Sequence, residues 1–208
     1  GIGGAEAKKL IEEHLNDRER WLRINAIEAL ARLGEHDAVP KLMQLAEVEK
    51  DPWVRASLVS ALGRLGGVEQ IPFCEAALNS PDARIRANAI ESLSRLGVHE
   101  SEWKNRIEPF LHDPNDRVRV NAAIALWKMG DASVVPALVT MAREATKWLR
   151  ASAAFALGEI GAREAVPALL ALLDDKEDVV YKNALQALGK IGDVNALIPI
   201  LKERSKER

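Results

Sequence analysis

The feature that most constrains this chain is a motif that recurs about every 31 residues. A leucine, isoleucine or methionine followed by glycine closes six segments, with the glycines at Gly34, Gly66, Gly97, Gly130, Gly161 and Gly192. The intervals are 32, 31, 33, 31 and 31 residues. Six matches at one period are very improbable by chance. A period of this length is typical of arrays of stacked supersecondary units.

Each unit is predicted to hold two helices. A recurring residue, arginine in five units and tyrosine in the sixth, lies eleven residues before each closing glycine. An asparagine or serine follows two residues after it. The pairs are Arg23/Asn25, Arg55/Ser57, Arg86/Asn88, Arg119/Asn121, Arg150/Ser152 and Tyr181/Asn183. Apolar residues follow at helical spacing, for example Val118, Ala122 and Leu126. The closing glycine suits a left-handed C-cap. The side chains suited to N-caps are Asp51, Asp82, Asn115 and Thr146.

A helix pair of this size cannot bury its apolar face alone, so neighbouring pairs must stack. The sequence therefore predicts an all-α solenoid without strands, in one domain over residues 1–208. We expect about six two-helix repeats plus a terminal helix, or about thirteen helices. The predicted repeats are 5–34, 35–66, 67–97, 98–130, 131–161 and 162–192, with a partial repeat over 193–208.

Segments such as Asp116 to Ala123, followed by Met129-Gly130 and Val135-Pro136-Ala137-Leu138, resemble the short HEAT-like repeats of the phycobilisome-lyase type. The resemblance covers nearly the whole chain. It implies a right-handed superhelix whose second helices line a concave surface. It says little about function, because such arrays serve many roles.

The pattern changes at its edges and in its middle. Ile2-Gly3 aligns with the helix-closing pair, so 5–15 reads as a first helix and 194–203 as a lone last one. The chain is therefore either a fragment of a longer array or a chain with an ordinary start. Pro109 lies inside a first helix and should bend it or end it early.

Certain positions of the second helices face away from the predicted core. Two residues before the recurring arginine this row reads Trp21, Trp53, Arg84, Arg117 and Trp148. On neighbouring helices, one apolar block contains Val120, Ile124, Trp127, Trp148, Ala151 and Phe155. Such a block is either a partner site with tryptophan anchors or an extension of the core over small neighbours.

Two polar rows accompany this face. The first is a basic row, interrupted by Glu159, that consists of Arg32, Arg64, Arg95, Lys128 and Lys190. Together with Arg84 and Arg117 it is either a site for an acidic peptide or phosphate backbone, or a solvated ridge. The recurring Arg and Asn/Ser positions lie beside the predicted buried face of each second helix. We predict that they join adjacent units, Arg to a nearby carboxylate and Asn to backbone.

No residue set indicates catalysis. The histidines His14, His36, His99 and His112 lack metal-ligand spacing. HEAT-repeat deoxyhypusine hydroxylases hold iron with several His-Glu pairs, and His99-Glu100 is a single pair. Cys74 reads as a core residue. As the only cysteine, it excludes an intramolecular disulfide and favours a cytoplasmic protein. We expect no metal, cofactor or enzymatic activity, and no membrane span.

The sequence favours a non-catalytic scaffold that binds a peptide, helix or protein on its concave face. Nucleic-acid binding is the first alternative, since HEAT-like alkylpurine DNA glycosylases use tryptophan and basic residues. The formal charge of −2 disfavours it, as does the lack of a candidate acid beyond Glu28 and Glu91. The second alternative, a bilin lyase-like subunit working with a partner chain, is implied only by the resemblance.

Overall fold

A computed structural model describes residues 2–97, 101–144, 146–192 and 198. All regular structure in these residues is helical, so the predicted all-α class is confirmed. The first helices of the repeats are α1 (Ile2–Glu13), α3 (Val39–Val48), α5 (Ile71–Ala77), α7 (Ser101–Ile107), α9 (Val134–Met141) and α11 (Val166–Ala171). The second helices are α2 (Arg20–Leu33), α4 (Pro52–Leu65), α6 (Ala83–Arg95), α8 (Asp116–Lys128), α10 (Lys147–Ile160) and α12 (Asp178–Ile191).

Short 3-10 segments join or extend these helices. They are η1 (His14–Asn16), η2 (His36–Ala38), η3 (Val68–Gln70), η4 (Glu108–His112), η5 (Arg163–Ala165) and η6 (Leu172–Asp174). The predicted effect of Pro109 is confirmed, because α7 ends at Ile107 and the chain continues as η4. The predicted last helix over 194–203 lies outside the described residues apart from residue 198.

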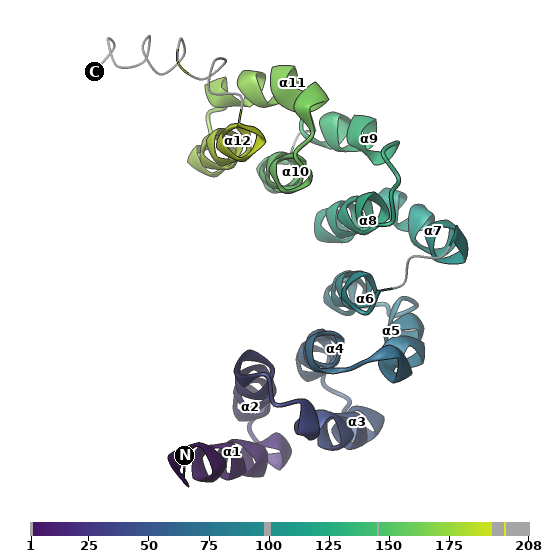
Figure 1. The fold of residues 1–208 in the computed structure, drawn as a ribbon, viewed down its shortest axis with the longest axis vertical. Coiled ribbons are helices and arrows are strands. Elements are labelled where there is room, and N and C mark those ends of the chain that lie inside the picture. Colours follow the sequence, from purple (N-terminus) through teal and green to yellow (C-terminus); the bar gives the residue numbers. More distant parts are fainter. Residues whose placement is uncertain (1, 98–100, 145, 193–197, 199–208) are drawn as a thin grey trace. The chain divides into compact units, whose positions relative to one another are not determined.

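The helices form two compact units, Gly1–Trp103 and Lys104–Arg208. In the first unit, α2, α4 and α6 contact one another in succession, and α1, α3 and α5 lie along one side of that row (Figure 1). In the second unit, α8, α10 and α12 form the corresponding row, with α9 and α11 beside it. Each unit thus has a layer of first helices and a layer of second helices.

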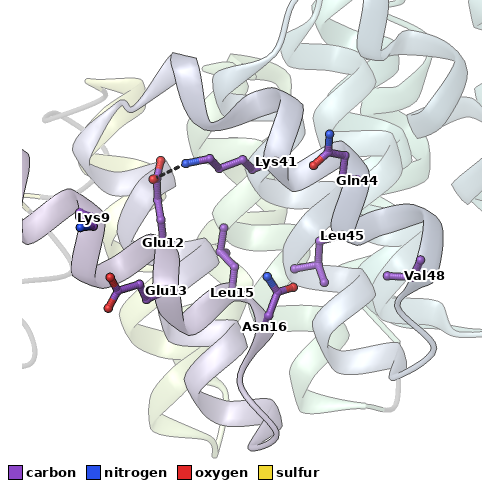
Figure 2. Close-up of a pocket in the computed structure, with 9 residues that line it drawn as sticks. All are labelled: Lys9, Glu12, Glu13, Leu15, Asn16, Lys41, Gln44, Leu45 and Val48. Atoms are coloured by element: carbon purple, nitrogen blue, oxygen red, sulfur yellow. Dashed lines mark hydrogen bonds and ion pairs between the residues drawn. The ribbon is translucent and has the colours of Figure 1, made fainter.

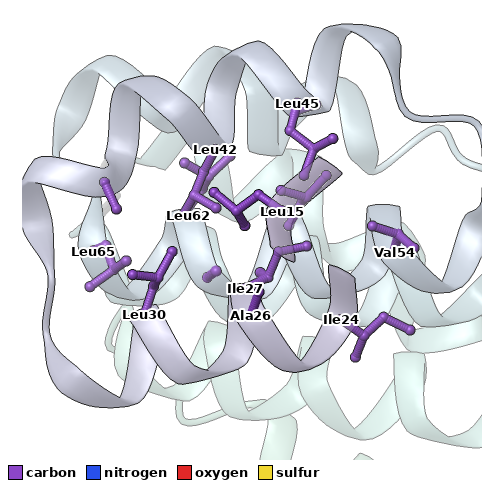
Figure 3. Close-up of a cluster of buried hydrophobic side chains, with 14 residues drawn as sticks. Leu15, Ile24, Ala26, Ile27, Leu30, Leu42, Leu45, Val54, Leu62 and Leu65 are labelled. Carbon is purple, nitrogen blue, oxygen red and sulfur yellow. The ribbon is translucent and has the colours of Figure 1, made fainter. Parts of the chain in front are cut away.

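The core of each unit lies between its two layers. Figure 3 shows this for the first unit, where Leu15, Ile27, Leu42 and Leu62 come from η1, α2, α3 and α4 and pack together. In the second unit the fully buried side chains include Ile107, Leu126, Leu138, Leu149 and Leu157. Helices of adjacent repeats share each core, so truncating one such leucine to alanine should cost about 2–5 kcal/mol.

The recurring arginine fixes the junction between the two helices of its own repeat. In five repeats its Nη1 donates a hydrogen bond to the carbonyl six residues earlier, at Asp17, Glu49, Ser80, Asp113 and Glu144, over 2.8–3.0 Å. In the first and fifth repeats the arginine also has the predicted carboxylate partner, which comes from the next repeat. Arg23 Nε lies 2.8 Å from Glu49, and Arg150 Nε lies 2.7 Å from Asp175.

The predicted asparagine-to-backbone contacts join adjacent second helices. Asn88 Nδ2 donates to the carbonyl of Ala56 over 2.8 Å, and Asn183 Nδ2 to that of Ala151 over 2.9 Å. These helices approach closely because small residues face each other. A Cβ added to Gly158 would lie 2.6 Å from Ala187 Cα. Any side chain at this position would push the two helices apart.

Five of the six closing glycines are left-handed as predicted, with φ between 68° and 86° at Gly34, Gly97, Gly130, Gly161 and Gly192. The prediction is wrong for Gly66, which is extended at φ −80° and ψ −178°. The chain there continues directly into Gly67 and η3. The Gly67 N–H donates to Gln70 Oε1 over 2.7 Å, so a side chain completes this turn.

Two further local predictions were wrong. Asp51, Asp82 and Asn115 accept N-terminal helix N–H groups as expected, but the Thr146 hydroxyl instead donates to Asp116 over 2.8 Å. The predicted first helix over 5–15 begins earlier, because α1 starts at Ile2.

Candidate binding surface

The exposed face of the second-helix row in the first unit carries what we call the tryptophan–arginine row, consisting of Arg20, Trp21, Trp53 and Arg84. The rings of Trp21 and Trp53 lie with centroids 6.0 Å apart and planes tilted by 54°. The guanidinium carbon of Arg84 lies 3.5 Å from the centroid of the Trp53 ring, and that of Arg20 lies 5.0 Å from the Trp21 ring. Trp21, Trp53 and Arg84 were predicted site residues, and the fold brings them together.

Helix capping positions this row. Asp51 accepts the N–H of Trp53 over 2.8 Å, which sets the ring at the first turn of α4. Asp82 accepts the N–H of Arg84 over 2.8 Å and also binds its guanidinium through Nε at 3.0 Å and Nη2 at 2.5 Å. This pairing lowers the pKa of Asp82 and raises that of Arg84. The charge of Arg84 is therefore already balanced within the chain.

In the second unit, some residues of the predicted apolar block are buried or half-buried, and others are exposed. Val120 and Ala151 are buried, and Ile124 and Trp127 are half-buried. Trp148 is 63% exposed and Phe155 42% exposed, both on α10. The nearest cations to these two rings are Lys147, with Nζ 5.6 Å from Trp148, and Lys190, with Nζ 5.2 Å from Phe155. Only the exposed part offers a large surface to a partner.

The remaining candidate, Arg117, is exposed at the start of α8 in the second unit, where its N–H donates to Asn115. The basic row is also exposed, and part of its charge is balanced along the same helices. Arg95 Nη2 lies 2.7 Å from Glu91, and Arg64 Nη2 donates to Ser60 Oγ over 3.2 Å. These contacts favour the interpretation of the basic row as a solvated ridge over its interpretation as a binding site for a phosphate backbone.

Two hollows lie away from the predicted aromatic site residues. Sequence reasoning missed the first, and the second lies beside two arginines of the basic row. One, of about 470 Å³, lies between α1 with η1 and α3, where Glu12 and Lys41 pair across it (Figure 2). Its lining is Lys9, Glu12, Glu13, Leu15, Asn16, Lys41, Gln44, Leu45 and Val48. The other, of about 600 Å³, lies at the ends of α4 and α6 beside Arg64 and Arg95. The first hollow is lined by acidic and basic side chains whose charges neutralise one another. It therefore favours neither an anionic nor a cationic ligand.

The described residues assemble no reactive centre. Burial raises the pKa of the Cys74 thiol to about 12, so this side chain is a core residue, as predicted, and a poor nucleophile. No group of three or more His, Cys, Asp or Glu side chains in the described part of the chain could hold a metal ion, and His99-Glu100 lies outside that part. None of the described helices has the length and apolar content to cross a bilayer.

Comparisons with known proteins agree with this architecture. A family profile described as HEAT repeats matches residues 7–94, 72–157 and 142–208. Among solved structures, the chain is similar to one from the complex of CpcE and CpcF of phycocyanin lyase from Nostoc sp. PCC7120, with 21% identity and a TM-score of 0.53, over 89% of this chain and 93% of the other.

Two further solved structures show the same fold. The Escherichia coli protein YIBA has 22% identity and a TM-score of 0.55, over 91% of this chain and 69% of its own. Kap121p has 17% identity and a TM-score of 0.62, over 99% of this chain and 28% of its own. No curated protein matches the chain. At these identities the structural likenesses establish the fold, a HEAT-like α-solenoid.

Proposed function

This chain belongs to the HEAT-repeat family, and we propose that it is a non-catalytic scaffold that holds a protein or peptide partner on the exposed faces of its second helices. One observation carries the proposal. Of nine aromatic residues, four lie on these faces with large exposed fractions: Trp21 at 51%, Trp53 at 44%, Trp148 at 63% and Phe155 at 42%. Tryptophan is enriched among the residues that dominate binding energy at protein interfaces.

The exposed part of the apolar block is the proposed anchor. Trp148 and Phe155 are exposed on one helix, α10, seven residues apart, so they lie on the same face two turns from each other. Of the other members of the predicted apolar block, Val120 and Ala151 are buried, and Trp127 and Ile124 are half-buried. A partner helix or extended segment with apolar side chains could cover both rings at once. Arg117 of the same unit would supply a secondary contact, and Trp21, Trp53 and Arg84 form a separate proposed contact surface on the first unit.

The comparison structures are compatible with a protein partner. One of them is described as a complex of CpcE and CpcF, so a chain with this fold assembles there with another protein. A chromophore-handling role is suggested by the same description, but no described contact in this chain favours it. Nucleic-acid binding is disfavoured by the −2 formal charge and by the pairing of Arg84 and Arg95 with carboxylates.

The proposal is tested by affinity capture with matched variants. The immobilised protein would be compared with a Trp148→Ala/Phe155→Ala variant and with a Val48→Ala control, since Val48 is exposed on a first helix. A genuine partner is retained by the wild type and the control and is lost on the double variant. Titration of the purified partner should then show affinity weakened by about thirtyfold, the equivalent of roughly 2 kcal/mol.

Thermal unfolding of each variant separates lost binding from lost folding. Equal binding by the double variant and the wild type would refute the anchor. A titration with duplex DNA at two salt concentrations, and one with a bilin followed by absorbance, test the two alternatives directly. Salt-sensitive DNA affinity or a shifted bilin spectrum, without any protein partner, would replace the scaffold proposal.

A further inference from the structure

The tryptophan–arginine row of the first unit is exposed even where helices flank it on both sides. Trp53 lies on α4, which contacts both α2 and α6, and it is still 44% exposed. Trp21 on the adjacent α2 is 51% exposed. Because Trp53 has a neighbouring second helix on each side, its exposure is a property of this face of the helix row. The face is therefore a surface that the stacking of repeats leaves open.

The charged side chains of the row are balanced by aspartates of the same unit. Two nitrogens of Arg84 donate to Asp82, and Arg20 Nη1 lies 3.8 Å from Asp51 Oδ2. Two arginines are thus matched by two aspartates. An anionic ligand would have to compete with Asp82 for Arg84, and a cationic ligand would meet the arginines. The row therefore favours an uncharged ligand.

The polar groups that the row leaves unused are hydrogen-bond donors. Within the part of the chain that the structure describes, neither indole N–H of Trp21 and Trp53 has an acceptor, and nor does Arg84 Nη1. The nearby acceptors are engaged. Asp51 Oδ1 accepts N–H groups at the start of α4, and Asp82 binds Arg84 with both carboxylate oxygens. The row is therefore complementary to a ligand that supplies acceptors and few donors.

A proline-rich segment has this chemistry. Proline has no backbone N–H, so a run of prolines offers carbonyl oxygens and no donors. Such runs form the polyproline II helix, whose carbonyls make no internal hydrogen bonds and which is ordered before it binds. Its rings are apolar and uncharged, and surfaces lined by aromatic side chains recognise segments of this kind. The segment matches the row both in charge and in hydrogen-bonding groups.

The spacing of the two tryptophans also fits this helix. Their ring centroids lie 6.0 Å apart. Two residues of a polyproline II helix advance by about 6.2 Å, since the rise is about 3.1 Å per residue. Prolines two positions apart can therefore each contact one of the rings. Arg84, whose guanidinium carbon lies 3.5 Å from the centroid of Trp53, is then the donor for a further carbonyl.

We propose that the tryptophan–arginine row binds a proline-rich segment of a partner protein in the polyproline II conformation. Proline rings of the segment contact Trp21 and Trp53, and its carbonyls accept hydrogen bonds from the two indoles and from Arg84. The inference rests on the proposed function, because it assigns a class of ligand to one of the second-helix faces proposed to hold a partner. The anchor at Trp148 and Phe155 lies in the other unit.

The test is isothermal titration calorimetry of the whole chain with acetylated decaproline amide as the probe. Saturable binding is expected. Decaglutamate is the probe for an anionic ligand, and a peptide of the same length with alternating glycine and serine tests a flexible neutral backbone. Both should bind at least about tenfold more weakly than decaproline, because the first carries uncompensated charge and the second lacks rings and must be ordered.

Two substitutions locate the site. Trp53→Ala removes the ring and its N–H, and should weaken decaproline binding by at least about tenfold. Trp53→Phe keeps an aromatic ring without the N–H, and should weaken it by about fivefold. Leu10→Ala is the matched control, because Leu10 is 59% exposed on α1 of the same unit and lies outside the row. It should bind like the wild type. Circular dichroism melts verify folding, and Trp53→Phe carries the test if Trp53→Ala does not fold.

The proposal is overturned if decaproline shows no saturable binding, if both Trp53 variants bind it as the wild type does, or if decaglutamate binds more tightly. These outcomes are distinguishable from failure of the proposed function. A partner captured through Trp148 and Phe155 without any decaproline binding would refute this inference alone. Decaproline binding that depends on Trp53, combined with full partner capture by the Trp148→Ala/Phe155→Ala variant, would support the inference and refute only the anchor.

Discussion

The two compact units present their exposed aromatic side chains in different surroundings. In the first unit, Trp21 and Trp53 contact each other, and Arg84 lies 3.5 Å above the second ring. In the second unit, the described residues bring only lysine nitrogens near the two rings, with Lys147 Nζ 5.6 Å from the Trp148 centroid and Lys190 Nζ 5.2 Å from the Phe155 centroid. The aromatic side chains of the first unit thus already contact other side chains of that unit. Those of the second unit are more accessible to a partner, which is why we place the proposed anchor there.

The packing of the second helices, by contrast, follows one rule in both units. Gly63 of α4 faces Ser92 of α6, and Gly158 of α10 faces Ala187 of α12. The equivalent Gly189 of α12 has no neighbour within 4 Å in the described part of the chain. The units therefore share a mechanism of stacking and differ in what they expose.

The largest expected effect probes the shared stacking. Gly158→Ala should destabilise the protein by about 2 kcal/mol, because the added Cβ would lie 2.6 Å from the Ala187 backbone and the helices must separate. Gly63→Ala should behave similarly in the first unit, where the added Cβ would lie 2.7 Å from Ser92 Cα. Urea unfolding measures both losses.

Gly189→Ala is the matched control for these two variants. It should stabilise the protein by up to about 1 kcal/mol, since alanine is the better helix former and no atom of the described part of the chain lies within 4 Å of the added Cβ. If all three substitutions had the same effect, close stacking would not be the reason for glycine at this position.

A smaller effect should separate the two aromatic surfaces. Trp53→Ala removes the ring pair with Trp21 and the contact with Arg84, and should cost about 1–2 kcal/mol of unfolding free energy. Trp148→Ala removes no ring pair among the described residues and only the longer contact with Lys147, whose Nζ lies 5.6 Å from the ring centroid, so it should cost less than about 0.5 kcal/mol. Urea titrations of both variants measure the difference. A Trp148→Ala loss as large as that of Trp53→Ala would place Trp148 in the core instead of at a binding site.

The smallest expected effect is a difference in acid sensitivity. Hydrogen bonds from Arg84 lower the pKa of Asp82, and those from Arg150 lower the pKa of Asp175. A carboxyl group whose pKa is lower in the folded state contributes stability above the ordinary value of 3.8, and this contribution disappears as pH falls through the lower folded value. The melting temperature should therefore fall as the solution is acidified below about pH 4.

Substitutions of the two aspartates by asparagine separate the contributions of the two units to this decrease in melting temperature at low pH. Asp175→Asn should flatten the acid dependence more than Asp82→Asn does, because the Arg150–Asp175 pair is less exposed than the Arg84–Asp82 pair. Melting curves recorded from pH 6 to pH 2.5, roughly across the titration range, provide the measurement. The reverse order would mean that the tryptophan–arginine row contributes more to folding than the contact between repeats.

Much of the architecture could be predicted from local residue patterns. Helical spacing of apolar residues, the recurring arginine and the closing glycine depend on backbone geometry within about one turn, so they can be recognised without knowing the neighbours. The same pattern predicted the Asn88 and Asn183 contacts, because a repeat's neighbour is another repeat of nearly the same sequence. Where the prediction failed, as at Gly66 and Thr146, a nearby side chain provided a competing hydrogen bond.

The sequence by itself determined the repeat, its helix pairs and the residues that join them. Only the tertiary structure decided which surface residues are free. Val120 is buried while Trp148 is exposed, and Trp21 contacts Trp53 across adjacent helices. Each of these outcomes depends on which helix lies beside the residue. A periodic sequence assigns equivalent positions the same role, whereas stacking decides which of these positions a neighbouring helix covers.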